Sequence, residues 1–277
     1  MSLFDLDGRV VVVTGALGQL GRQFCDALIA QGARVAGLDQ LRADAATSLI
    51  ADRGGKNLKE ADGSRFAYMQ ADVTDKESLE NARAAIEAHF GEAAFGLVNN
   101  AALDAPPDSD ARETGPFETY PIENWNKVFS VNATGPFLCC QVFGSAMAEA
   151  GRGSIVNVGS IYGIVSPDQN LYQYRRDRGE TFYKPVAYSA SKSSLYNLTR
   201  YLAGYWGGKG VRANIVTFAG VFNNQDKAFL DRYLPKVPLN RMADETDYNG
   251  TIVYLMSDAS AYMTGSNVVI DGGFSAL

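Results

Sequence analysis

The sequence predicts an α/β protein with a doubly wound, seven-stranded, mostly parallel sheet between two layers of helices. Three observations lead to this prediction. Short apolar runs alternate with stretches of helical period, a glycine-rich loop follows the first run, and an aspartate ends the second. A repeated strand, helix, strand order places right-handed crossover helices on both faces of a parallel sheet. The chain of 277 residues has no linker rich in proline or serine, so we expect a single domain over residues 1–277.

The expected strands are short apolar runs. The first is typical of a strand buried on both faces, because it contains consecutive valines with no polar residue between them. The runs cover residues 9–13, 33–38, 65–70, 95–98, 154–158, 211–216 and 267–270.

The expected helices lie between these runs. In one of them Leu79, Ala82 and Ile86 share a face, and Asp75 stands near its start. The stretches of helical period cover residues 17–28, 76–90, 123–150 and 195–205.

Three segments interrupt the alternation, at residues 104–116, 166–185 and 222–239. In an open parallel sheet, the loops after the carboxyl ends of the strands surround the ligand crevice. Because the second and third segments follow the fifth and sixth strands, we predict that they are substrate-side loops.

Composition excludes several classes of protein. A net charge of −6 argues against a nucleic-acid or anionic-membrane partner, and one histidine with three scattered cysteines leaves few ligands for a metal site. The longest aliphatic run, Val10 to Val13, is far shorter than a membrane helix, and residues 1–9 lack the features of an export signal. We therefore expect a cytoplasmic protein without a metal and without disulfides.

The glycine-rich loop, Thr14 to Gly21, predicts a phosphate-binding turn. Gly15 permits the tight turn, Gly18 lets the backbone approach a pyrophosphate, and Gly21 lets the helix pack against the strand. The helix N-terminus offers free N–H groups to the phosphates. The alternative is a glycine-rich turn without a ligand.

Asp39 ends the second strand and favours NAD over NADP. Its carboxylate can accept hydrogen bonds from the adenosine ribose hydroxyls and would repel a 2′-phosphate. No basic residue lies immediately beside it, and Arg42 is the nearest. The alternative role is that of a helix N-cap.

Tyr188 and Lys192 are spaced so that they share one helix face, and Ser160 follows the fifth strand. A free phenol, with a pKa of about 10, is a poor base near neutrality. We expect the Lys192 ammonium and a positive nicotinamide ring to lower the pKa of Tyr188, which would then act as general base for an alcohol proton.

These features together resemble the short-chain dehydrogenase/reductase family over nearly the whole chain. The matching residues are TGALGQLG, Asp39, the run 71–73, NNAA at 99–102, SVNATG at 130–135, Ser160, YSASK and the glycines near residue 273. The resemblance implies a compact Rossmann fold and a catalytic set of Asn132, Ser160, Tyr188 and Lys192. Asn132 would shape its helix to anchor a water leading from Lys192 to solvent, and Ser160 would hold the substrate oxygen.

The resemblance also extends the cofactor site. Asp72 would bind adenine, and the backbone of Val221 would bind the nicotinamide carboxamide. The implied cofactor-binding residues are Gly15, Leu17, Gly18, Gln19, Leu20, Gly21, Asp39, Asp72, Val73, Asn99, Ala101, Tyr188, Lys192 and Val221. The chain departs from the family at Gln19, where compact members usually have glycine, and at Ala102. As in tetrameric relatives, we expect a homo-oligomer, a tetramer or a dimer.

The segment between Ser160 and Tyr188 is about twice as long as is usual in the family. It is aromatic and basic, so we predict that Tyr162 and three arginines bind a substrate, and that the arginines attract an anion. The arginines are Arg175, Arg176 and Arg178. The alternative is a solvated loop or a subunit contact. The segment resembles a subgroup associated with bacterial carbohydrate modification.

The predicted function is therefore NAD-dependent interconversion of a secondary alcohol and a ketone on a sugar, polyol or sugar derivative. Two alternatives stay open. One is an epimerase or dehydratase that holds NAD tightly, which the glycine spacing favours slightly. The other is a non-catalytic NAD-binding regulator.

Overall fold

The computed structural model describes residues 3–41, 65–104 and 113–276, and within them seven strands form one parallel sheet in the order β3-β2-β1-β4-β5-β6-β7. Central strand β1 pairs with β2 at Val12↔Ala36 and with β4 at Val12↔Leu97. The strands are β1 Val10–Thr14, β2 Arg34–Asp39, β3 Phe66–Gln70, β4 Gly96–Asn99, β5 Gly153–Val158, β6 Val211–Phe218 and β7 Asn267–Ile270. The predicted doubly wound α/β fold is confirmed.

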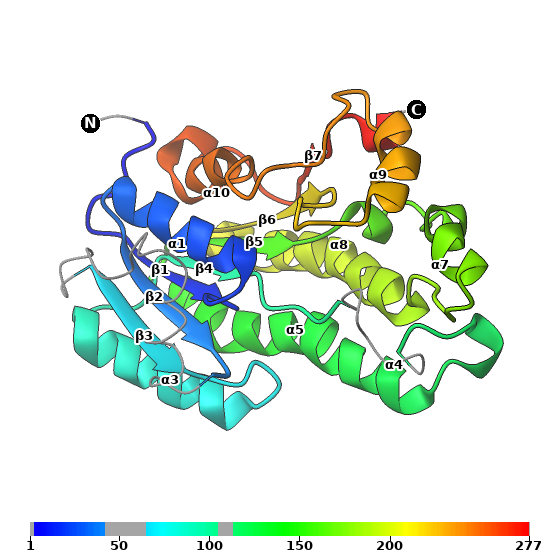
Figure 1. Cartoon of the computed structure of the whole chain (residues 1–277). Helices are drawn as coiled ribbons and strands as arrows, with labels where there is room; N and C mark the ends of the chain where they lie inside the picture. The colour runs from blue at the N-terminus through cyan, green and yellow to red at the C-terminus, as the bar shows by residue number, and fades with distance from the viewer. Residues whose placement is uncertain (1–2, 42–64, 105–112, 277) are drawn as a thin grey trace.

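Helices cover both faces of this sheet, with α1 and α10 on one side and α3, α5 and α8 on the other (Figure 1). The helices are α1 Gln19–Ala30, α3 Lys76–Phe90, α4 Ile122–Phe129, α5 Gly135–Cys139, α6 Ser145–Glu149, α7 Gln173–Asp177, α8 Val186–Trp206, α9 Lys227–Tyr233 and α10 Asn249–Met256.

The consecutive valines of β1 serve two cores at once. Val11 and Val13 pack with α1 and α10, while Val10 and Val12 pack with α3 and α8. Successive strand residues point to opposite faces, so a strand covered on both sides needs apolar residues at every position. Because β1 is packed on both faces, it is held rigidly between the two helix layers, and so is the loop that follows its carboxyl end.

The predicted long helix over 123–150 is present but is not uniform. It runs from Ile122 to Glu149, with π-helical turns over Ser130–Thr134 and Cys140–Gly144. π-helical turns inside an α-helix frequently occur at functional sites, and the first of these contains Asn132.

The two predicted substrate-side loops pack on each other at the carboxyl edge. Residues 166–185 contain α7, and residues 222–239 contain α9. An aromatic cluster joins them, with the Tyr172 ring tilted against those of Phe182 and Phe229 at ring-centroid distances of 4.9 and 5.7 Å. Of the first predicted loop, 104–116, residues 105–112 lie outside the described residues.

Candidate active site

The loop between β1 and α1 has the shape of a phosphate cradle. Gly15 has φ +63°, and a Cβ there would lie 2.8 Å from the Cα of Ala101. At Gly21 a Cβ would lie 2.0 Å from the Gly15 carbonyl oxygen. Gly18 is the N-cap of α1 and no side chain caps it, so the helix N-terminus is available to an anion. These residues fit a dinucleotide pyrophosphate.

Asp39 closes this cradle from the end of β2. One carboxylate oxygen accepts a hydrogen bond from the Leu17 N–H at 3.1 Å, and the other accepts from the Leu41 N–H at 3.4 Å. The contact with Leu17 joins the acidic residue to the glycine loop, as a ribose-binding position requires. The neighbouring residue Arg42 lies outside the described residues.

Two other predicted adenosine-side residues, Asp72 and Asn99, lie in different environments. Asp72 is exposed and its carboxylate accepts from the N–H and hydroxyl of Thr74, both at 2.8 Å, so it lies at the surface of the same edge. Asn99 is only 2% exposed, and its amide donates to Asn157 Oδ1 at 2.8 Å. The side chain of Asn99 therefore links β4 to β5 inside the protein, and the prediction that Asn99 lines the adenosine and phosphate side stays a prediction.

Asn100 performs a role that the sequence reasoning missed. Its amide donates to the carbonyls of Thr14 and Gly15 at 3.0 and 3.1 Å, and its N–H donates to the Thr14 hydroxyl at 3.0 Å. These bonds hold the start of the glycine loop. The signal was present in the paired asparagines at the end of β4, but only the registry of β4 beside β1 shows which one faces the loop.

Two further predicted cofactor residues are tied to the loop after β6. Gln19, which replaces the family's usual glycine, donates from Nε2 to the Phe222 carbonyl at 3.1 Å. The Val221 carbonyl accepts from Gln225 Nε2 at 2.9 Å, and Val221 pairs with Ala243 in an isolated bridge. Gln19 therefore connects the start of α1 to the loop that carries Val221. Leu20 packs partly buried against the core of the α1 face.

The proposed catalytic side chains converge at the end of β5. Tyr188 and Lys192 lie on α8, and the side chain of Ser160 is close enough to the Tyr188 hydroxyl to lower its pKa. The Ser160 hydroxyl is fixed because it accepts from the Tyr162 N–H at 3.2 Å. Lys192 is 3% exposed and donates from Nζ to the Val158 carbonyl at 2.8 Å.

Burial dominates the electrostatics of this group in the protein without its cofactor. Burial, followed by the Asp104 carboxylate, raises the pKa of Tyr188 to about 12, against the opposing effects of Lys184 and the Ser160 side chain. Burial lowers the pKa of Lys192 to about 8, and its Nζ lies 6.0 Å from the centroid of the Tyr188 ring. In the protein alone, desolvation disfavours both charged forms, and the lowering of the Tyr188 pKa by Lys192 and a positive nicotinamide ring stays a prediction for the complex with the cofactor.

Asn132 joins the segment after β4 to α8, the helix that carries Tyr188 and Lys192. Its side chain accepts from the Leu103 N–H at 2.7 Å and donates to the Leu103 carbonyl at 2.9 Å and to Ser191 Oγ at 3.2 Å. The π-helical turn that carries Asn132 is therefore fastened both to the segment after β4 and to α8. The water that Asn132 would anchor stays a prediction.

The three arginines of the insertion do not converge on a ligand position. Arg175 pairs with Glu180, and Arg178 pairs with Asp226 at 2.8 Å. Arg176 donates to the carbonyls of Gln169 and Phe182 at 2.7 and 2.9 Å. The prediction that they attract an anionic substrate gains no support, because each guanidinium already binds an acceptor of the protein.

Arg176 should therefore matter for stability and not for substrate affinity. Replacing it with methionine removes its hydrogen bonds to two carbonyls and to the Gln173 side chain. We expect the melting temperature to fall by about 3 to 8 °C, since each bond contributes roughly 1 kcal/mol. The control is Arg178→Met, which loses one exposed ion pair and should change the melting temperature by less than about 2 °C. A raised KM for anionic substrates with an unchanged melting temperature would contradict this assignment.

The described residues contain neither a group of metal ligands nor a helix suited to cross a membrane. In the ranges 3–41, 65–104 and 113–276, no three histidine, cysteine, aspartate or glutamate side chains are grouped to hold a metal ion. None of the helices described is both long enough and apolar enough to cross a membrane.

The fold and this group of side chains define a Rossmann-type oxidoreductase, and comparisons with known proteins agree. A family model described as "Enoyl-(Acyl carrier protein) reductase" matches residues 15–275. The chain belongs to the short-chain dehydrogenase/reductase family.

Relatives of known name cover nearly the whole chain. It is 33% identical to D-threitol dehydrogenase of Mycolicibacterium smegmatis, over 98% of this chain and 95% of that protein. It is 32% identical to galactitol 2-dehydrogenase (L-tagatose-forming) of Cereibacter sphaeroides, over 99% of this chain and 98% of that protein.

Solved structures agree on the fold and differ in cofactor. A short chain dehydrogenase from Leptospira borgpetersenii with bound NAD+ superposes with a TM-score of 0.82 at 29% identity, over 99% of this chain and 95% of that one. The NADPH-dependent 3-quinuclidinone reductase from Rhodotorula rubra has a TM-score of 0.78 at 26% identity, over 99% and 94%. The family uses a nicotinamide cofactor.

Proposed function

We propose that this protein oxidises a secondary hydroxyl of a sugar alcohol to a ketone, with NAD as the hydride acceptor, and catalyses the reverse reduction. The observation that carries the proposal is the convergence of Tyr188, Ser160 and Lys192 at the carboxyl edge of the sheet, the edge that also carries the glycine loop. Relatives named for threitol and galactitol support the substrate class.

The side chains would divide the chemistry as follows. Tyr188 takes the hydroxyl proton, and Ser160 donates a hydrogen bond to the substrate oxygen as its charge changes. Lys192 is held near both by the Val158 carbonyl. Bound NAD would accept the hydride, and its positive ring would favour the phenolate, opposing the burial that raises the pKa of Tyr188.

A panel of polyols, sugars, phosphosugars and sterols tests the proposed function. We expect NAD to be reduced with four- to six-carbon polyols at the largest kcat/KM, followed by the absorbance of the reduced cofactor. Turnover only with a phosphosugar or a sterol would reject the sugar-alcohol assignment.

Asp39 makes NAD the preferred cofactor in this proposal. Its carboxylate is fixed beside the loop by the Leu17 N–H, where it would repel a 2′-phosphate. We expect kcat/KM with NAD to exceed that with NADP by at least about tenfold, and Asp39→Ser to reduce this ratio. An NADP preference in the unchanged protein would overturn the cofactor assignment and leave the catalytic group unaffected.

The two alternatives make different predictions. An epimerase or dehydratase would retain NAD through gel filtration, whereas a dehydrogenase of the proposed kind releases it in each cycle. A regulator would bind NAD without reducing it in the presence of any alcohol on the panel.

A further inference from the structure

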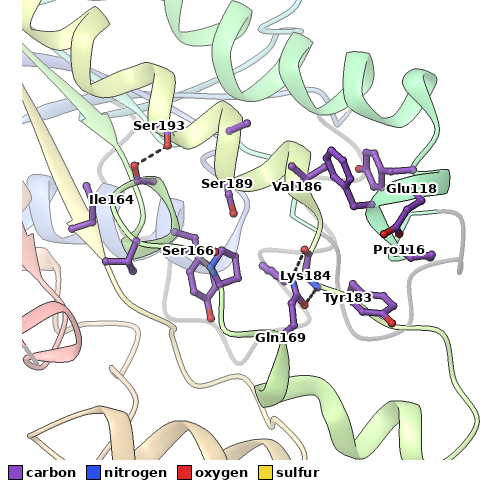
Figure 2. Close-up of a pocket in the computed structure, with 18 residues that line it drawn as sticks. Pro116, Glu118, Ile164, Ser166, Gln169, Tyr183, Lys184, Val186, Ser189 and Ser193 are labelled. Carbon is purple, nitrogen blue, oxygen red and sulfur yellow. Dashed lines mark hydrogen bonds between the residues drawn. The ribbon is translucent and has the colours of Figure 1, made fainter.

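A cavity of about 690 Å³ is lined by residues that adjoin Ser160 and Tyr188 in the sequence, and it contains polar side chains that the proposed mechanism does not use. Four segments form its wall: residues 115–120, the turn after β5, the insertion at 166–185 and the start of α8. Lys184, Tyr162, Gln169 and Ser189 are among its lining residues. Figure 2 shows Lys184, Gln169 and Ser189 around this space.

Lys184 connects the cavity to the catalytic tyrosine. Its side chain is 9% exposed, and its Nζ lies 4.7 Å from the centroid of the Tyr188 ring and 5.9 Å from that of Tyr162. This ammonium is nearer to the Tyr188 ring than that of Lys192, which lies at 6.0 Å. Lys184 therefore both faces the Tyr188 ring and lines the cavity.

Lys184 is rigidly placed and remains charged. Its backbone N–H donates to Gln169 Oε1 at 2.9 Å, and its carbonyl accepts from Gln169 Nε2 at 3.1 Å (Figure 2). Its Nζ donates to both carboxylate oxygens of Asp104, at 2.5 and 2.7 Å. Burial alone would lower the pKa of Lys184, but the Asp104 carboxylate and the nearby tyrosines outweigh it and raise that pKa.

The Lys184 ammonium has hydrogen-bonding capacity left for a ligand. An ammonium has three donors, and within the described part of the chain those of Lys184 bind only Asp104. The Ser189 hydroxyl is buried and has no hydrogen-bond partner among the described residues, although it lines the same cavity. A buried polar atom of this kind calls for a polar ligand or an ordered water.

The charge balance favours an uncharged ligand. The positive charge of Lys184 is matched by Asp104, Glu118 also lines the cavity, and the insertion's arginines are engaged elsewhere. A carboxylate or phosphate would find no net positive charge here, whereas hydroxyl groups can both donate to a carboxylate and accept from an ammonium.

We propose that Lys184 and Asp104 form a hydroxyl-binding pair that holds the part of an uncharged polyol remote from its reacting carbon, with the cavity accepting the rest of its chain. This inference rests on the proposed function and deepens it. The pair selects hydroxyl-rich, neutral substrates and sets their position against Tyr188.

The test compares polyols with an alcohol that has one hydroxyl. In Lys184→Met we expect KM for D-threitol and galactitol to rise about ten- to hundredfold relative to KM for 2-butanol, whereas the loss of the ammonium beside Tyr188 should change kcat for all three alcohols alike. Lys184→Arg should recover most of the polyol affinity. The matched control is Lys236→Met, which removes an ammonium paired with Asp168 at 2.8 Å. Lys236 does not line the cavity, so this variant should change the KM of neither the polyols nor 2-butanol.

Several outcomes would overturn the pair. Equal losses for threitol and 2-butanol would indicate a general effect on Tyr188, and an unchanged KM for the polyols would remove the role altogether. If Lys184→Met does not fold, the neutral double variant Lys184→Met/Asp104→Asn is judged by the same ratio of polyol to butanol.

Polyol binding to the complex with reduced cofactor, followed by quenching of its fluorescence, separates the two proposals. Binding without turnover in the unchanged protein rejects the proposed function, and the variant's Kd then decides the pair. Turnover of polyols with equal KM in the variant rejects the pair alone. Neither binding nor turnover with any polyol rejects both.

Discussion

Replacing Tyr188 with phenylalanine should lower kcat for alcohol oxidation by about a thousandfold while NAD affinity stays within a few-fold of the original. The substitution removes only the hydroxyl beside Ser160, and general base catalysis contributes roughly 10²–10⁴ in rate. The ring remains beside Lys184, so the packing of the site should be kept. Steady-state kinetics and a fluorescence titration with the reduced cofactor measure the two effects.

The pH profile supplies the control for this prediction. Because burial raises the pKa of Tyr188 to about 12 in the protein alone, the phenol is protonated at neutral pH and must lose its proton before it can act as a base. The kcat/KM for oxidation should therefore rise with pH, with an apparent pKa below 12 once the positive cofactor is bound. The residual rate of Tyr188→Phe should lack this rise. A variant that keeps both the rate and the slope would assign the proton transfer to another group.

Replacing Gly21 with alanine should abolish measurable NAD binding and lower the melting temperature by about 3 to 10 °C. The new Cβ would lie 2.0 Å from the carbonyl oxygen of Gly15 and 2.9 Å from the Cα of Ala16. Both neighbours are backbone, so α1 or the glycine loop must move, at a cost of about 1–3 kcal/mol. Differential scanning calorimetry with and without NAD measures both effects.

Gly204 provides the matched control on α8. It is exposed, and a Cβ there would meet nothing within 4 Å. Gly204→Ala should therefore leave NAD binding intact and stabilise the helix by up to about 1 kcal/mol. If Gly21→Ala behaves like Gly204→Ala, the close packing of α1 against the loop is not what creates the cofactor cradle.

The insertion between Ser160 and Tyr188 illustrates the limit of charge patterns. Its arginines are close in sequence, and sequence alone favours a shared anionic ligand. In the structure they bind separate acceptors, and Arg178 reaches Asp226 at the start of α9. Acceptors supplied by a distant segment or by backbone carbonyls cannot be read from local composition, because they depend on how the two loops pack.

The spacing of the proposed catalytic tyrosine and lysine could be read from the sequence because it is local. Tyr188 and Lys192 are one helical turn apart, so any helix through them places both on one face. The glycine loop was readable for the same reason, since its turn depends on the φ of Gly15 and on the absence of side chains. The choice between Asn99 and Asn100 was not readable, because strand register alone decides which side chain faces inward.

The sequence by itself determined the alternating fold, the strand edge that carries the site, and the identities of the tyrosine, lysine and serine, because periodicity and short motifs encode these locally. Only the tertiary structure decided that Lys184 lies nearer to the Tyr188 ring than Lys192, and that Asp104 neutralises it. Those facts depend on burial and on contacts between segments far apart in the chain, and desolvation and charge pairing act through distance in space.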